Sequence, residues 1–224
     1  MPIIELENVT KLYKQKKRHR GDKRYEVGVE QVDLTIRQGD FVFVIGSSGA
    51  GKSTLLSLIA GQTRPTRGRV YVGHKDLSWM MKLSRNRASI LFGKVWQEPT
   101  LIRNRTVGEN LALANRIVSP RDGERQLVPK VKKVLGLVGL SGFEDKYPVE
   151  MSIGEARRVE LARALIGSPP ILVLDEITAN LDDDSIWDVF HLLTELNRRG
   201  TTIIMATHAS QYVNIMRRRV ITLV

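Results

Sequence analysis

An eight-residue stretch that begins at Gly46 has the residue types that hold phosphate groups. It fits the pattern G-x-x-x-x-G-K-[ST], in which spaced glycines let successive backbone N–H groups curl around an anion. A helical pattern follows, so a helix N-terminus adds positive potential at the same place. Lys52 would reach the β- and γ-phosphates of a nucleotide, and the Ser53 hydroxyl would ligate Mg²⁺. The predicted phosphate-binding residues are Gly46, Ser47, Ser48, Gly49, Ala50, Gly51, Lys52, Ser53 and Thr54.

Two acids follow an apolar stretch far along the chain. Residues 171–174 are apolar at every position, which is typical of a strand buried inside a parallel sheet. Asp175 comes directly after them, where a carboxylate beside a phosphate loop can hold Mg²⁺ through a water. Glu176 is expected to project to the other side and to polarise an attacking water as a general base.

The hydrophobic pattern predicts the elements that position these residues. Residues 41–45 and 201–206 are predicted to be further buried strands. Residues 98–160 are predicted to form a helical insertion between strands of the sheet. Other strands are predicted at 3–9, 32–36, 67–72, 90–96 and 171–174, and helices at 52–60, 107–114, 127–139, 153–166, 182–199 and 211–218.

Composition narrows the functional classes. The 224 residues can bury one substantial core, and the absence of cysteine excludes disulfide and thiolate chemistry. Acids within the first apolar run argue against a signal peptide, and no apolar run is long enough for a membrane span. Lys and Arg exceed Asp and Glu by 35 to 24, and part of this excess is a basic segment from Lys14 to Arg24. Such a segment suits binding of nucleic acid, anionic lipid or a nucleotide ligand, or it is a solvated loop without a partner, and the sequence alone does not rank the three ligands.

With these motifs in this order, the sequence resembles the ATPase subunits of ABC transporters over nearly its whole length. The resemblance implies that Tyr13 stacks on adenine and that Gln97 touches Mg²⁺ and senses a membrane partner. Asp182 resembles the D-loop acid that crosses the dimer interface. His208 matches the histidine that contacts the γ-phosphate, which makes it a candidate catalytic residue beside Lys52 and Glu176.

Residues 151–155, Met-Ser-Ile-Gly-Glu, stand where this family has Leu-Ser-Gly-Gly-Gln/Glu. By physical chemistry alone, Ser152 and Glu155 predict a capping box at a helix start. The resemblance adds that Ser152, Ile153, Gly154 and Glu155 face the γ-phosphate held by the opposite subunit. Ile153 would be the first helical residue, where a β-branched side chain is allowed. We therefore expect Ile153 to weaken or re-tune the contact rather than abolish it.

The resemblance implies an α/β P-loop NTPase with a mainly parallel sheet, a small antiparallel β part and a helical subdomain. Residues 1–97 and 161–224 would form the nucleotide-binding core, and about 98–160 the helical subdomain. Two copies are expected to clamp two ATP–Mg²⁺, with ATP and Mg²⁺ as cofactors. Because no membrane span is found, the permease would be a separate chain, placing this one in the cytoplasm at the inner face of the membrane.

Within the family, the chain most resembles the FtsE subfamily, which works with the membrane protein FtsX in cell division. The features that carry this narrower likeness are the short chain, residues 106–110 (Thr-Val-Gly-Glu-Asn), and the C-terminal residues 205–208 and 216–223. Three alternatives stay open: an exporter or lipoprotein-release ATPase, a nucleotide-gated binding module with weak turnover, and a protein that acts on nucleic acid. The last is disfavoured, because such relatives fuse two ATPase domains or carry a long coiled coil. For the segment from Lys14 to Arg24, we expect contact with anionic lipid or an acidic part of the permease.

Overall fold

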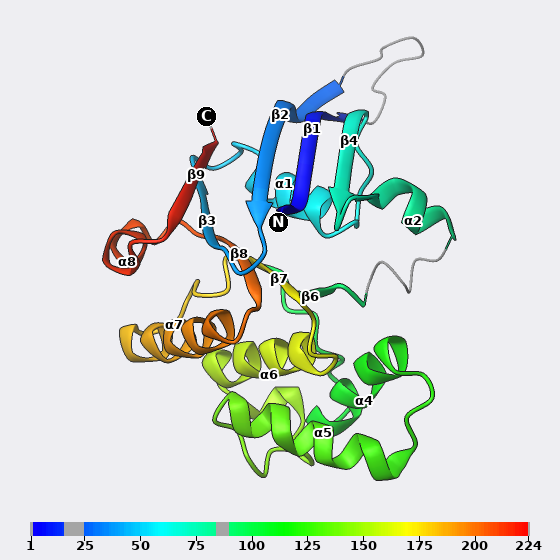
Figure 1. The fold of residues 1–224 in the computed structure, drawn as a ribbon. Helices are drawn as coiled ribbons and strands as arrows, with labels where there is room; N and C mark the ends of the chain where they lie inside the picture. The colour runs from blue at the N-terminus through cyan, green and yellow to red at the C-terminus, as the bar shows by residue number, and fades with distance from the viewer. Residues whose placement is uncertain (1, 16–24, 84–89, 224) are drawn as a thin grey trace.

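The computed structural model describes residues 2–15, 25–83 and 90–223, which form two sheets and the helices around them (Figure 1). The parallel sheet has the strand order β6 (Phe92–Val95), β7 (Ile171–Asp175), β8 (Thr202–Ala206), β3 (Phe41–Gly46), β9 (Arg219–Leu223). The antiparallel sheet has the order β2 (Tyr25–Arg37), β1 (Pro2–Lys14), β4 (Arg67–Val72), β5 (Lys75–Asp76).

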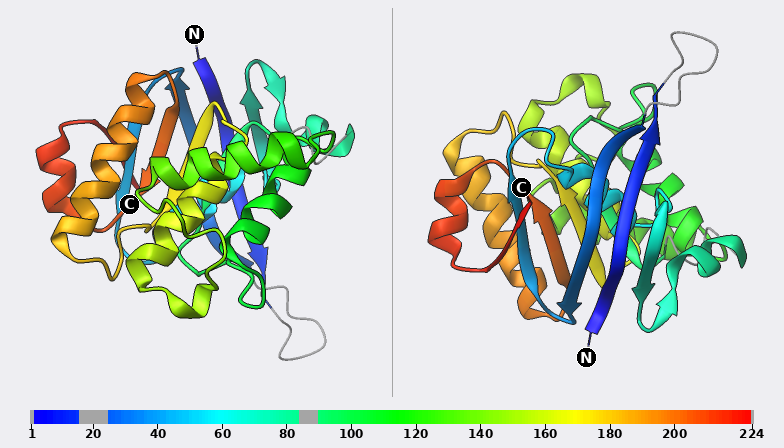
Figure 2. Two further views of the ribbon diagram at one scale, coloured as in Figure 1. Left: turned by 90° about the horizontal axis from the view of Figure 1, so that it is seen from below. Right: turned by 90° about the horizontal axis from the view of Figure 1, so that it is seen from above.

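The helices separate the molecule into layers. Helix α1 (Lys52–Ile59) packs in a core with β1, β4 and one face of the parallel sheet. On the other face lie α6 (Ile153–Leu165) and α7 (Asp183–Arg198), and α4 (Val107–Val118) and α5 (Glu124–Leu137) pack against α6. Seen from below, α4 and α5 cover the sheet, whereas β1 and β2 cross it when it is seen from above (Figure 2). The remaining helices are α2 (Leu77–Leu83), α8 (Ser210–Met216) and the 3₁₀ turn η1 (Pro148–Glu150).

The three central strands of the parallel sheet, β7, β8 and β3, each carry an apolar run of four or five residues because both faces are covered. In β7, Leu172 and Leu174 point into the core shared with α6 and α7, while Ile171 and Val173 point into the core shared with α1. Side chains alternate between the faces of a strand, so a strand with two buried faces needs an uninterrupted apolar run. The prediction of buried strands at 41–45, 171–174 and 201–206 is confirmed.

The first two strands are longer than the sequence pattern indicated. β1 continues to Lys14 and β2 begins at Tyr25, where we expected strands at 3–9 and 32–36 only. Asn8 and Gln31 have positive φ angles of 45° and 47°, and the register between the strands shifts nearby. Such bulges break the alternation of apolar and polar residues on which strand prediction depends.

One other expectation was wrong in detail, and two elements were missed. α8 ends at Met216 rather than 218, because Arg217 adopts a left-handed conformation with φ 46°. The chain then forms β9, an edge strand that pairs with β3 and that the pattern did not indicate. Helix α2 was also missed, since it is only seven residues long.

Two predictions from the sequence are not tested by the structure: the division into core and helical subdomain, and the role of the basic segment. The boundary at residue 160 between core and helical subdomain falls inside α6, and the division itself stays a prediction. Most of the basic segment from Lys14 to Arg24, residues 16–24, lies outside the described residues. Among the described residues, no helix is both long and apolar enough to cross a membrane.

Candidate nucleotide-binding site

The loop between β3 and α1 has the backbone that its glycines predict. Gly49 and Gly51 adopt left-handed conformations, with φ angles of 83° and 92°. A Cβ atom on Gly51 would lie 2.0 Å from the carbonyl oxygen of Gly28 in β2, so a side chain is excluded there by space as well as by backbone angle. The loop therefore keeps a tight curl, with the N-terminus of α1 beginning at Lys52.

Lys52 is buried and turns back over this loop. Its Nζ donates hydrogen bonds to the carbonyl oxygens of Gly46 and Ser47, at 3.0 Å each. A buried ammonium needs such acceptors, and they hold the charge at the mouth of the loop. The positive charge is therefore placed where a phosphate would meet the backbone N–H groups.

Asp175 lies at the carboxyl end of β7 and is buried, with 3% of its surface exposed. Its Oδ1 has no hydrogen-bond partner among the described residues. Burial raises the pKa of this carboxyl, whereas the hydroxyl of Ser53 and the charges of Lys52 and His208 act in the opposite direction. A buried carboxylate oxygen without a partner indicates that a cation or an ordered water completes the site.

Glu176 and His208 meet at the ends of neighbouring strands. The backbone N–H of Glu176 donates to Ala206 O at 3.1 Å, and Glu176 has a positive φ of 51°. Its Oε2 accepts from the backbone N–H of His208 at 3.3 Å, and its Oε1 lies 3.4 Å from His208 Nε2. Residues 32 positions apart in sequence are thus joined because β7 and β8 are adjacent and parallel.

One cavity of about 290 Å³ beside the phosphate loop is lined by Lys52, Glu176 and His208 but not by Asp175. It brings together Tyr13, Lys52, Gln97, Glu176 and His208, which the sequence had placed at widely separated positions. The start of β2 supplies lining residues that sequence reasoning missed. The full lining is Tyr13, Glu26, Val27, Gly28, Ser48, Gly49, Gly51, Lys52, Ser53, Thr54, Gln97, Glu176 and His208.

Gly28 is the clearest of the missed residues. A Cβ atom on it would lie 2.8 Å from both Thr54 and the ring of Tyr13. The absence of a side chain therefore lets the Tyr13 ring approach the start of α1. The single signal in the sequence is a glycine inside an otherwise β-rich stretch, which often marks a close approach.

The segment 151–155 lies outside this cavity. The predicted capping box is confirmed: Ser152 Oγ accepts from the N–H of Glu155 at 3.2 Å, and the N–H of Ser152 donates to Glu155 Oε2 at 2.8 Å. The bond from Ser152 lowers the pKa of the Glu155 carboxyl. Ile153 is 61% exposed, and a Cβ atom on Gly154 would lie 3.6–3.7 Å from Ser185 and Leu181. The start of α6 thus lies beside the start of α7.

Asp182, the other residue predicted to act across a dimer interface, is also outside the cavity. It caps α7, and its Oδ1 accepts from the N–H of Ser185 at 2.8 Å. The bonds from Ser185 lower the pKa of the Asp182 carboxyl. In a single chain, Asp182 and the start of α6 therefore form a surface separate from the cavity.

Comparison with known proteins identifies the fold and the family. Residues 29–179, more than half of the chain, match the family model described as ABC transporter. The chain belongs to this family. It has the fold of an ATP-binding cassette and is an ABC-type ATPase.

Curated ABC proteins resemble this ATPase over most of its length. It is 39% identical to the cell division ATP-binding protein FtsE of Bacillus subtilis, over 90% of this chain and 89% of that protein. It is also 39% identical to the methionine import ATP-binding protein MetN 2 of Rhodococcus jostii, over 99% of this chain but 63% of that protein.

Among solved structures, this ABC ATPase resembles the cassette MJ0796, described as a dimer in a post-hydrolysis state bound to ADP and Pi. The two share 30% sequence identity and a TM-score of 0.84, over 98% of this chain and 94% of that chain.

Proposed function

We propose that this ABC ATPase binds ATP–Mg²⁺ in the cavity beside the phosphate loop and hydrolyses it there. The observation that carries the proposal is the meeting of Lys52, Gln97, Glu176 and His208 around one cavity. Lys52 would exchange the carbonyl oxygens of Gly46 and Ser47 for the β- and γ-phosphates. The Tyr13 ring, which Gly28 allows to lie close to α1, would stack on the adenine.

The residues present suit a magnesium ion that arrives with the nucleotide. The unpartnered Oδ1 of Asp175 would hold the ion through a water, with Ser53 and Gln97 as the other protein contacts. Within the described part of the chain, no three His, Cys, Asp or Glu side chains converge to hold a metal alone. A site with one carboxylate is usual for Mg²⁺, because the ion keeps several water ligands and takes the others from the phosphate oxygens of the nucleotide. When bound, the ion would neutralise charge on the phosphates.

Glu176 is proposed as the general base and His208 as the group that contacts the γ-phosphate. Glu176 Oε1 is buried and, apart from the 3.4 Å approach of His208 Nε2, has no hydrogen-bond partner within the described part of the chain, so it can accept a proton from an attacking water. His208 Nε2 lies 3.4 Å from Glu176 Oε1, and the His208 side chain is 55% exposed, so it can reach both the carboxylate and a phosphate. The two side chains would then respond together to the presence of the γ-phosphate.

The start of α6 is proposed to bind the ATP of a second copy. The free N–H groups of a helix N-terminus bind phosphate, but Ser152, Ile153, Gly154 and Glu155 do not line this chain's own cavity. With the nearby Asp182, they form the surface that a partner copy would cover. The description of MJ0796 as a dimer supports this arrangement, in which two chains clamp two nucleotides.

Replacing Ile153 tests this clamp. Because its branched side chain is exposed at the start of α6, Ile153→Gly should strengthen ATP-driven dimerisation, by about tenfold in Kd for each 1.4 kcal/mol gained. Ile153→Ala should act in the same direction, which separates side-chain bulk from glycine flexibility, and Ile153→Val should leave the affinity unchanged. The affinity is measured by sedimentation with ATP–Mg²⁺. Equal affinities for all four proteins would show that the side chain does not meet the partner's nucleotide.

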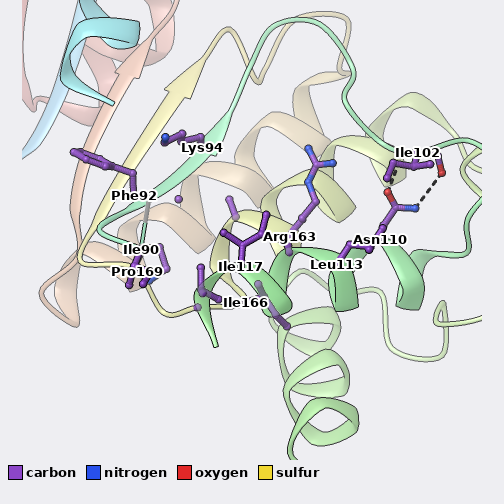
Figure 3. Close-up of a pocket in the computed structure, with 15 residues that line it drawn as sticks. Ile90, Phe92, Lys94, Ile102, Asn110, Leu113, Ile117, Arg163, Ile166 and Pro169 are labelled. Atoms are coloured by element: carbon purple, nitrogen blue, oxygen red, sulfur yellow. Dashed lines mark hydrogen bonds between the residues drawn. The ribbon is translucent and has the colours of Figure 1, made fainter. Parts of the chain in front are cut away.

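A second hollow supports docking of a separate membrane protein. It is a largely apolar groove of about 360 Å³ between the start of β6, α4 and α6. The charged ends of Lys94 and Arg163 lie among these apolar side chains (Figure 3). Burial lowers the pKa of both groups, and none of the ion pairs between described residues involves either one. The groove therefore suits an amphipathic helix that carries an acidic residue.

We propose an FtsX-like membrane protein as the source of this helix, with the chain held at the inner face of the cell membrane through it. The FtsE relatives are 35–39% identical to this chain and cover most of both chains, which supports the cell-division role. The second candidate is the ATPase of a transporter, favoured by MetN relatives of equal identity. Identification of the membrane protein that co-purifies with this chain distinguishes the two. Contact of the segment from Lys14 to Arg24 with anionic lipid stays a proposal, tested by binding to anionic vesicles after charge removal.

Ile117 provides a direct test of the groove. It lines the groove on α4 and is 51% exposed, so Ile117→Glu should leave the fold intact and remove co-purification of the membrane protein. Ile215→Glu is the matched control, because Ile215 is 60% exposed on α8 and does not line the groove. Retained co-purification of Ile117→Glu would place the docking surface elsewhere, whereas ATP binding by the isolated chain should be the same in all three proteins.

A further inference from the structure

Helix α6 carries a buried charged pair that the nucleotide cavity does not use. Arg157 Nη1 and Glu160 Oε2 lie 2.8 Å apart, and the two residues are 8% and 1% exposed. Residues three apart share a face of a helix, and Arg163 continues the row. Burying such a pair is weak evidence for stability, because removal of two charges from water offsets their attraction. Its contacts therefore point to another role.

The row of side chains holds the segment that follows β6. Arg157 donates to the carbonyl oxygens of Trp96, at 2.9 Å, and of Gln97. Glu160 Oε1 accepts from the backbone N–H of Thr100 at 2.6 Å. One turn further on, Arg163 donates to the carbonyl oxygen of Thr100 at 2.7 Å. Residues 96–100 are thus held along nearly two turns of α6 through their backbone groups, and a change of side chain in that segment would not remove these bonds.

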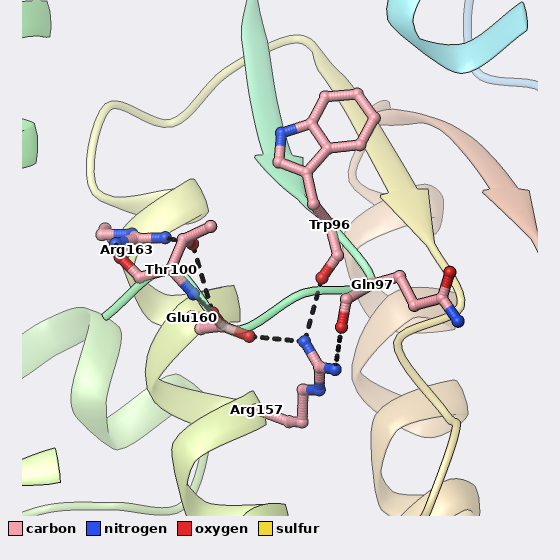
Figure 4. A network of polar contacts seen from close by, with 6 residues as sticks. All are labelled: Trp96, Gln97, Thr100, Arg157, Glu160 and Arg163. Atoms are coloured by element: carbon pink, nitrogen blue, oxygen red, sulfur yellow. Dashed lines mark hydrogen bonds and ion pairs between the residues drawn. The ribbon is translucent and has the colours of Figure 1, made fainter. Parts of the chain in front are cut away.

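Gln97 faces in two directions at this point. Its carbonyl oxygen points to the guanidinium of Arg157, while its side-chain amide extends away from the network (Figure 4). The side chain lines the nucleotide cavity of the same chain. Arg157 therefore reaches the nucleotide cavity through a single residue, Gln97. It lies in the second turn of α6, the helix that begins after Ser152.

We infer that Arg157 is a positioning residue that couples the two nucleotide sites of the dimer. The inference rests on the proposed function, in which Gln97 meets the chain's own ATP and the start of α6 meets the ATP of the second copy. A shift of Gln97 when the nucleotide binds would move the carbonyl oxygens of Trp96 and Gln97. Because Arg157 donates hydrogen bonds to both oxygens, the shift would be passed on to α6. The two sites would then fill cooperatively, because each chain's α6 serves its partner's nucleotide.

The guanidinium is suited to this task in a way that lysine is not. Its planar fork donates from Nη1 to Glu160 and to the carbonyl oxygen of Trp96, and from Nη2 to the carbonyl oxygen of Gln97. The single ammonium of lysine keeps the charge pair with Glu160 but cannot reproduce the fork. Arg157→Lys therefore tests the connection to residues 96 and 97 while it retains the buried charge balance, and Arg157→Gln removes both.

The experiment measures ATP turnover against ATP concentration for the purified full chain, well below the melting temperature of each variant. The wild type should give a Hill coefficient of about 2, the limit for two coupled sites, and both Arg157 variants should move it toward about 1. Binding of ATP to the isolated monomer should be unchanged, since Arg157 does not line the cavity. Arg198→Gln is the control: it breaks an Arg–Glu pair of the same spacing, with Glu195, on the exposed face of α7.

The outcomes separate this inference from the proposed function. A Glu176→Gln variant that does not dimerise with ATP–Mg²⁺ would overturn the proposed function itself. A wild type that dimerises but fills its sites independently would overturn the coupling. Arg157 variants with the wild-type Hill coefficient and a lower melting temperature would show that the network serves stability alone. Loss of cooperativity in Arg157→Lys, with Arg198→Gln unchanged, would establish Arg157 as the connection.

Discussion

Glu176→Gln should lower ATP turnover by roughly 10²–10⁴-fold, the contribution of a positioned general base, while ATP binding persists. The buried Oε1 of Glu176 has no hydrogen-bond partner among residues 2–15, 25–83 and 90–223, and Glu176 lines the cavity beside His208, so it is the group placed to take a proton from water. The amide of glutamine has nearly the same shape but cannot take the proton. Turnover is measured by phosphate release, and binding by equilibrium titration with ATP–Mg²⁺.

The matched control is Glu26→Gln, which alters an exposed acid that lines the same cavity without contacting His208. It should retain turnover close to that of the wild type. Undiminished turnover by Glu176→Gln would contradict the assignment of the base and direct attention to His208.

Asp175→Asn should raise the melting temperature of the nucleotide-free protein and lower Mg²⁺-dependent turnover by about a hundredfold or more. Burial raises the pKa of Asp175, so the folded state holds the proton more tightly than the unfolded state does. The stability contributed by this group is present at low pH and is lost as pH rises from its ordinary pKa through the raised one. Asparagine removes the buried charge and with it this loss.

The pH dependence supplies the control for that prediction. Above the raised pKa, the wild type should melt below Asp175→Asn, and at acidic pH, where Asp175 is protonated, the difference should shrink. The measurement is a thermal melt across pH without nucleotide. Addition of ATP–Mg²⁺ should stabilise the wild type more than the variant, because the ion compensates the carboxylate. A variant that melts below the wild type at every pH would contradict the account of Asp175 as an uncompensated charge.

The nucleotide site could be predicted from the sequence because its motifs coincide with unambiguous elements. The uninterrupted apolar runs at 41–45, 171–174 and 201–206 identify strands buried on both faces. Each run is followed within a few residues by a side chain of the candidate site: Lys52 after the first, Asp175 after the second and His208 after the third. Parallel strands bring such ends to one edge, so the order of the motifs was enough to place them together.

The contribution of β2 could not be predicted. Glu26 and Gly28 line the cavity because β2 pairs with β1 as far as Lys14 and Tyr25. The positive φ angles at Asn8 and Gln31 disturb the alternating pattern of both strands. The positions where the chain leaves regular β geometry are those at which alternation carries no information.

The Arg157 network escaped sequence reasoning for a different reason. Its partners are the backbone carbonyl oxygens of Trp96 and Gln97, which every residue type possesses. A pattern of residue types cannot report a contact of this kind. The available signal was a charged pair at three-residue spacing, Arg157 and Glu160, and such a pair is equally typical of an exposed helix face.

The oligomeric mass of Glu176→Gln by light scattering, with and without ATP–Mg²⁺, tests the central claim most directly. Because this variant binds ATP but turns over slowly, it should accumulate in the closed state. We predict a monomer without nucleotide and a dimer with ATP–Mg²⁺, and the dimer should be lost when Lys52 is also changed to Ala. A mass that stays monomeric with ATP–Mg²⁺, in both Glu176→Gln and the double variant Glu176→Gln/Ile153→Gly, would contradict the clamp of two chains around two nucleotides.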